Sequence, residues 1–148
     1  MDLKREIEEK LKESIKRQEK EKVTVFRLLL TNLKNKEVEK RRSLTEEEFY
    51  GVVKSLVRQH QESIESFKKG GRTDLVEAEQ RELEILESLL PRPLTEAELE
   101  KAVEEGIKEV GAKDRKDMGK VIKLIIERYP GRVDGKTLSE MVLKRLSK

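Results

Sequence analysis

Cysteine and tryptophan are absent from this sequence, and other residues that often carry chemistry are scarce. Only 3% of the 148 residues are aromatic, and His60 is the single histidine. Without cysteine, a disulfide scaffold and a cysteine-ligated zinc site are both excluded. A core therefore has to be built from leucine, isoleucine and valine, with Phe26, Phe49 and Phe67 as the few large side chains.

Long apolar runs are also missing. The run Leu28–Leu30 is far shorter than the roughly 20 residues that a membrane-spanning helix needs. The first residues, Met1–Glu6, are mostly charged and lack the apolar segment of a signal peptide. We therefore predict a cytoplasmic protein without a membrane partner.

Charged residues make up 44% of the sequence and apolar residues 34%. The apolar residues recur at helical spacing. In the first segment Leu3, Ile7, Leu11 and Ile15 recur every four residues and predict one buried stripe. In a second helix, about residues 23–42, the predicted buried side extends to Val38. No segment alternates as a strand does, so we predict an all-α fold.

Helix-breaking signals divide this helical pattern. Thr45 with Glu48, and Thr95 with Glu98, have the spacing of capping boxes that start helices. Two prolines in Leu90–Pro93 prevent a helix from continuing through that stretch. We predict a four-helix, bundle-like domain over residues 1–90, a proline hinge at 91–94 and a small three-helix domain over 95–148.

Candidate catalytic and metal sites are weak in the sequence. His60 lies on an apolar stripe between Leu56 and Ile64, so we interpret it as a structural or interface residue. The glycine pair at Gly70–Gly71 lacks the pattern of a phosphate-binding loop and is better explained as a helix end. Five glutamates crowd one segment and are expected to face water or pair with neighbouring cations: Glu77, Glu79, Glu82, Glu84 and Glu87. We predict no catalytic residue, no metal and no cofactor.

Positive charge is concentrated at the C-terminal end. Residues 113–148 carry eleven lysines and arginines against five acids, whereas the net charge of the whole chain is only +3. Lys116, Lys120 and Lys123 fall at spacings of four and three, which places them on one helix face, and Gly119 leaves the backbone beside them uncovered. The candidate nucleic-acid-binding residues are Lys116, Gly119, Lys120, Lys123, Arg128, Gly131, Arg132, Lys136 and Arg145.

This basic segment lacks the interleaved aromatic residues that stack on single-stranded bases. Recognition of the backbone and shape of a structured RNA is therefore favoured over base readout, and no sequence-specific DNA binding is expected. An ordinary solubilising surface would show the same composition.

Four stretches together resemble the GatB/YqeY family over nearly the whole chain. They are Phe26–Glu39, Glu62–Leu75, Leu89–Glu96 and Asp117–Val121 followed by Gly131–Gly135. The resemblance implies a helical bundle followed by a three-helix domain, and kinship with the tail of the B subunit of the tRNA-dependent amidotransferase. In that enzyme the tail grips tRNA away from the chemistry. A tRNA-contact role carries over only to Gly119, Lys120, Gly131 and Arg132, which match the tail's motif.

We therefore expect a non-catalytic accessory protein that binds tRNA or another structured RNA. One alternative is a helical adaptor that binds a protein partner through its N-terminal helices. A second alternative is a component of a carbon–nitrogen ligase that uses glutamine as nitrogen donor, although the motifs of a glutaminase or transamidase are not found in this chain.

Overall fold

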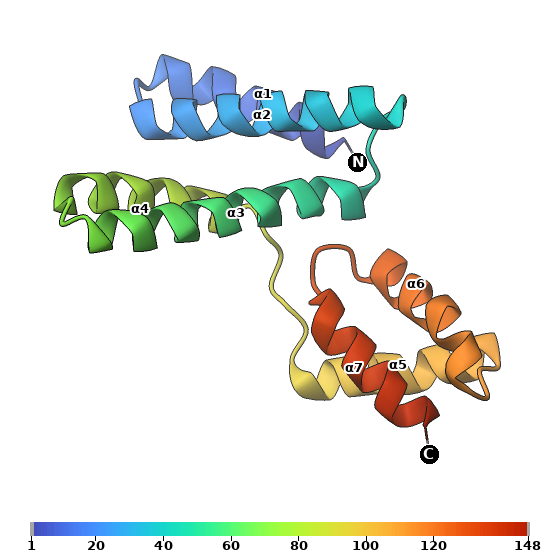
Figure 1. Cartoon of the computed structure of the whole chain (residues 1–148). Helices are drawn as coiled ribbons and strands as arrows, with labels where there is room; N and C mark the ends of the chain where they lie inside the picture. Colours follow the sequence, from blue (N-terminus) through green and yellow to red (C-terminus); the bar gives the residue numbers. More distant parts are fainter. Residues whose placement is uncertain (1, 148) are drawn as a thin grey trace. The chain divides into compact units, whose positions relative to one another are not determined.

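The computed structural model describes residues 2–147, which form helices and connecting loops without a strand (Figure 1). The all-α prediction is confirmed. The helices are α1 (Leu3–Lys16), α2 (Lys20–Lys40), α3 (Glu46–Lys69), α4 (Thr73–Ser88), α5 (Glu96–Val110), the 3₁₀ turn η1 (Arg115–Asp117), α6 (Met118–Arg128) and α7 (Gly135–Leu146). None of these helices within residues 2–147 is long and apolar enough to cross a lipid bilayer.

The chain divides into two compact units, Met1–Leu90 and Pro91–Lys148, here called the N-terminal unit and the C-terminal unit. In the N-terminal unit, α1 and α2 form one antiparallel hairpin and α3 and α4 form another, with α2 in contact with both α3 and α4 (Figure 1). The core between them is mostly aliphatic, with Phe26 and Phe49 as its buried aromatic residues. Its most deeply buried side chains are Val25, Leu29, Leu33, Val53, Leu56 and Leu86.

Two apolar residues that the sequence pattern places inside are in fact exposed. Ile15 is 48% exposed and Val38 is 78% exposed. A residue four positions further along a helix is rotated by about 400°, so a strict four-residue stripe drifts about 40° per step and Ile15 leaves the face that Leu3 and Ile7 share. Ser14 is buried in its place and donates its hydroxyl hydrogen bond to the Lys10 carbonyl at 2.8 Å. Val38 lies five residues after the buried Leu33, about 140° away around the helix.

Both predicted capping boxes are present. The Thr45 hydroxyl accepts from the Glu48 amide at 3.2 Å, and the Glu48 carboxylate accepts from the Thr45 amide at 2.9 Å. Thr95 and Glu98 repeat the arrangement at 3.1 and 3.0 Å. An arginine precedes each capping threonine and forms an ion pair with the capping glutamate. Arg42 pairs with Glu48, and Arg92 pairs with Glu98.

In the C-terminal unit, α5, α6 and α7 enclose a second aliphatic core that includes Val103, Val121, Ile125, Leu138 and Val142. Gly106 is buried on α5 and faces α6. A Cβ atom at Gly106 would lie 3.5 Å from side-chain atoms of Val121 and Ile125, which is ordinary van der Waals contact.

The room at Gly106 leads to opposite expectations for two substitutions. Gly106→Ala should raise the free energy of unfolding by about 0.5–1 kcal/mol, because alanine is the better helix former and its methyl group fits. Gly106→Leu should lower it by about 1–3 kcal/mol through overpacking. Urea unfolding followed by circular dichroism measures both, and an equal loss in the two variants would contradict this packing.

The capping glutamates make the free energy of unfolding depend on pH in the acidic range. Hydrogen bonds from Arg42 and from the Thr45 amide lower the pKa of Glu48 to about 2, and those from the Thr95 amide and Arg92 lower the pKa of Glu98 to about 2. A carboxylate whose pKa is lower in the folded than in the unfolded protein stabilises the folded state. This contribution is fully present when the pH is above the unfolded-state pKa near 4.5, and it is lost as the pH falls toward about 2. Stability should therefore fall over this acidic range.

The double variant Glu48→Gln, Glu98→Gln should be less stable at neutral pH and should lose less further stability between about pH 4.5 and pH 2, since its caps cannot titrate. Urea midpoints measured across this range test the expectation. Glu62→Gln, Glu100→Gln is the matched control, because both side chains are exposed in mid-helix. A parallel pH profile for the capping variant and the wild type would show that the caps do not carry the effect.

Candidate nucleic-acid interface

The basic segment is held in place where it enters α6. The Asp114 carboxylate accepts from the Lys116 amide at 2.9 Å, and the Asp117 carboxylate accepts from the Lys113 amide at 3.0 Å. The bond from the Lys113 amide is the main reason that the pKa of Asp117 is lowered, with the charges of Lys120 and Lys113 adding to it. These bonds fold η1 against the start of α6.

Three lysines are exposed in η1 and α6. On α6, Val121 and Ile125 are buried against α5 and α7, so the helical period turns Lys120 and Lys123 toward solvent. Lys116 is exposed in the 3₁₀ turn η1 that leads into α6. No carboxylate of residues 2–147 forms an ion pair with any of the three lysines. This set of three residues is called the lysine face below. Glu127 is next along the same side of α6 and limits the lysine face toward the helix C-terminus.

Gly119 lies beside the lysine face on the first turn of α6. It is exposed, and an added Cβ would meet no atom within 4 Å. Packing inside the protein therefore does not require glycine here. Its small size leaves the backbone next to Lys120 open to a large ligand.

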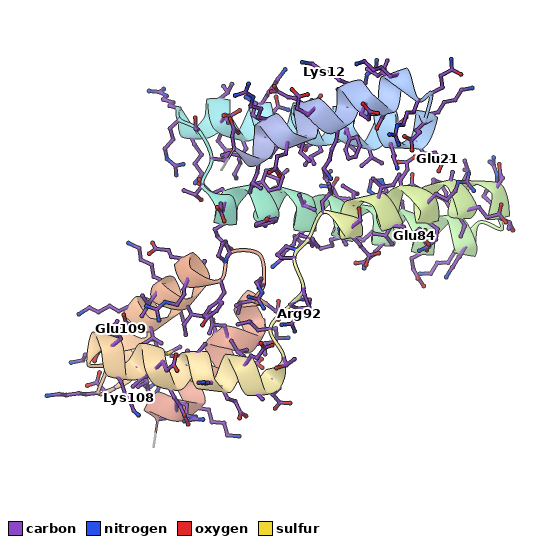
Figure 2. All side chains as sticks on the ribbon, turned by 180° about the vertical axis from the view of Figure 1, so that it is seen from behind. Lys12, Glu21, Glu84, Arg92, Lys108 and Glu109 are labelled. Carbon is purple, nitrogen blue, oxygen red and sulfur yellow. The ribbon has the colours of Figure 1, made fainter. Side chains whose placement is uncertain are left out.

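Two of the predicted contact arginines are instead paired with acids of α5. The Arg128 guanidinium lies 2.8 Å from a Glu109 carboxylate oxygen, and that of Arg145 lies 2.7 Å from Glu104. The Arg145 pair lowers the pKa of Glu104. Glu109 is near the end of α5 in Figure 2. Both arginines thus tie α6 and α7 to α5 through ion pairs at the surface.

Gly131 and Arg132 form the turn between α6 and α7. Gly131 is buried with a φ of 75°, a left-handed conformation that favours glycine. The Arg132 Nε donates to the Arg92 carbonyl at 2.9 Å, and the Leu94 amide donates to the Arg132 carbonyl at 2.9 Å. Arg92 lies in the stretch before α5 (Figure 2). Arg132 therefore holds this stretch against the turn, a contact that no sequence pattern indicates.

The predicted residues thus fall into two groups. Lys116, Gly119, Lys120 and Lys123 are exposed in η1 and the first turns of α6, and Lys136 is exposed in the first turn of α7. The remaining four have identifiable structural contacts or backbone requirements: Arg128, Gly131, Arg132 and Arg145.

The glutamates of α4 also differ among themselves. Glu77, Glu84 and Glu87 are exposed, as expected, whereas Glu79 and Glu82 are partly buried and face His60 of α3. Within residues 2–147, these three side chains are the one group of metal-ligand type whose ligand atoms all lie within 4.8 Å of one another.

The most similar relatives include fungal proteins named "Altered inheritance of mitochondria protein 41, mitochondrial". The one from Eremothecium gossypii is 34% identical over 94 residues, which are 62% of this chain and 51% of that protein. The one from Lachancea thermotolerans is 40% identical over 68 residues, or 45% of this chain and 36% of that protein. The chain thus spans about half or less of these two relatives.

A Saccharomyces cerevisiae protein of the same name is 29% identical over 129 residues, covering 86% of this chain and 68% of that protein. These names contradict the predicted cytoplasmic location, because the relatives are named as mitochondrial proteins. The predicted family, in contrast, is confirmed. The family model described as Yqey-like protein matches residues 4–146, and this chain belongs to that family.

Proposed function

We propose that the C-terminal unit binds the phosphate backbone of a structured RNA, with tRNA as the first candidate, through the lysine face. The observation that carries this proposal is that Lys116, Lys120 and Lys123 are all exposed around the start of α6 and that none of them forms an ion pair within residues 2–147. Unpaired, mobile ammonium groups gain most from phosphate, because no ion pair within the protein has to be broken first.

The size of the lysine face suits a polyanion better than a small anion. Lys116 in η1 and Lys123 on α6 are seven residues apart, which is roughly 10 Å or more along the helical segment. A nucleic-acid strand offers phosphates in succession over such a length, so that each lysine can meet its own phosphate. Gly119 allows that strand to approach the helix backbone closely.

The aromatic content favours a folded RNA over an unpaired strand. Tyr129 is the single aromatic residue of the C-terminal unit, and it is partly buried with the Arg132 guanidinium 5.9 Å from its ring centre. This unit therefore offers no row of rings on which bases could stack. Binding through phosphates and shape is the mode that remains, and it positions an RNA without reading its sequence.

An accessory role fits these features better than catalysis. The lysine face contains no nucleophile or general base, and resemblance to the tRNA-gripping tail of an amidotransferase subunit favours a holding function. The adaptor alternative has less support. Leu28 and Val38 are exposed on α2, but they are ten residues apart, about 15 Å along the helix and about 80° around it, so they do not form one apolar surface.

Charge reversal on the lysine face tests the proposal. Lys116→Glu, Lys120→Glu, Lys123→Glu should weaken tRNA binding at least tenfold, because each substitution replaces attraction to a phosphate with repulsion. The plot of log K against log salt concentration should become less steep by about 2–3, at 0.7–0.9 for each phosphate that is no longer neutralised. Gel-shift or fluorescence titration at several salt concentrations gives both quantities.

The matched control is Lys10→Glu, Lys20→Glu, Lys34→Glu, which makes the same change in net charge on exposed helix positions of the N-terminal unit. If the control loses as much affinity and salt dependence as the lysine-face variant, binding reflects net charge alone. If the wild type binds no tRNA at low salt at tens of micromolar protein, the proposal is wrong.

Two further measurements separate the alternatives. Nuclease treatment of a pull-down should remove the captured partner if RNA is bound directly, and should leave it in place if the chain is a protein adaptor. Release of ammonia from glutamine by the purified chain would indicate a ligase component. We expect no ammonia release.

A further inference from the structure

His60 is buried in the N-terminal unit with both ring nitrogens engaged. It lies on α3 against α4 and is 6% exposed. Its Nδ1 atom is 2.9 Å from the carbonyl oxygen of Leu56, one turn earlier on the same helix. A carbonyl oxygen only accepts hydrogen bonds, so Nδ1 carries a hydrogen and donates it. In a neutral imidazole, this leaves Nε2 as a bare lone pair.

That lone pair would face two carboxylates. The Nε2 atom lies 3.2 Å from Glu82 Oε1 and 3.6 Å from Glu79 Oε2. Glu79 and Glu82 are three residues apart on α4, so both project from the same side of the helix toward α3. Ionised carboxylates are also acceptors only. Three acceptors directed at one point repel one another unless a positive charge lies between them.

Neighbouring side chains do not supply that charge. No lysine or arginine among residues 2–147 forms an ion pair with Glu79 or Glu82, although Arg81 lies between them in sequence. Arg81 instead pairs with Glu21 at 2.7 Å. A cation bound between the three acceptors would supply that charge.

The spacing of the three ligand atoms matches a small metal ion. Two ligands that each lie 2.0–2.1 Å from a tetrahedral ion are about 3.3–3.4 Å apart. The two distances from Nε2, 3.2 and 3.6 Å, lie on either side of this value, and all three ligand atoms are within 4.8 Å of one another. The two spacings from the histidine thus suit a small ion between α3 and α4.

The surroundings also resemble those of a metal-binding histidine. Such a histidine usually donates its other ring N–H to a carbonyl or carboxylate, which orients the ring, and Leu56 does this here. The side chains of Glu82 and Glu79 keep 20% and 26% of their surface exposed, compared with 8% for His60. A metal ion could therefore enter from solvent and retain water as a further ligand.

We propose that His60, Glu79 and Glu82 form a binding site for a divalent transition-metal ion such as Zn²⁺. One imidazole with two carboxylates suits this class of ion, whereas Mg²⁺ and Ca²⁺ prefer sites made of oxygen ligands alone. The ion bridges α3 and α4 across their packed faces. This inference concerns the N-terminal unit and does not depend on RNA binding by the lysine face.

Calorimetric titration of the chelator-treated full chain with ZnCl₂ tests the site. We expect one Zn²⁺ per chain, bound in the presence of millimolar MgCl₂ and accompanied by a rise in the thermal unfolding midpoint. Glu79→Gln and Glu82→Gln keep the shape of each side chain but remove an anionic ligand. Each should weaken Zn²⁺ binding by about 100-fold or more, since loss of a group that only supports a ligand already costs 10–100-fold.

The control is Glu84→Gln, which removes an exposed carboxylate from the same helix and should leave Zn²⁺ affinity unchanged (Figure 2). Circular dichroism confirms that each variant remains helical, and the glutamate variants decide the question even if His60→Gln fails to fold. The proposal is overturned if the folded wild type takes up no stoichiometric Zn²⁺. It is also overturned if Glu79→Gln and Glu82→Gln bind Zn²⁺ as tightly as Glu84→Gln.

Discussion

Burial of one aliphatic face per helix is the constraint on which this structure depends. The chain has few aromatic residues and no disulfide, so each unit relies on leucine, isoleucine and valine meeting across helix pairs. A helix with one apolar face is stable only when a neighbour covers that face. The polar and charged side chains therefore lie mainly on the helix faces that this packing does not cover.

Arginine and lysine side chains make different contacts in the C-terminal unit. Arg92, Arg128, Arg132 and Arg145 all make specific bonds to carboxylates or carbonyls within the unit, whereas Lys116, Lys120 and Lys123 pair with no acid among residues 2–147. The difference has a chemical basis. The planar guanidinium offers several donors in a rigid arrangement that suits defined protein partners, while the ammonium group of lysine is a hydrated point charge on a flexible stem. Charge that is not used to hold the fold remains available to a ligand.

The N-terminal unit presents the opposite electrostatic situation. Its notable polar group is negative and partly buried, with two carboxylates turned toward one histidine between α3 and α4. Burying like charges together costs free energy unless a positive charge accompanies them. The two units therefore differ in their chemistry: exposed lysines in the C-terminal unit, and two carboxylates around a buried imidazole in the N-terminal unit.

Local patterns in the sequence were enough to predict the all-α class and the starts of two helices. The capping boxes at Thr45 and Thr95 depend on bonds between residues a few positions apart, so the sequence itself contains both partners. The exposure of Lys120 and Lys123 follows from helical periodicity in the same way. Where the pattern misled, at Ile15 and Val38, the helical rotation had moved the side chain away from the buried face.

Tertiary structure decided which charges pair between different helices. Arg145 and Glu104 are 41 residues apart, Arg132 and Arg92 are 40 apart, and His60 and Glu82 are 22 apart. Such partners meet only because the helices pack in one particular register. That register cannot be predicted from a single sequence. The sequence by itself thus determined the helical class and the location of positive charge, since both depend on near neighbours. Packing determined which cations remain unpaired and brought His60, Glu79 and Glu82 together, since those contacts connect different helices.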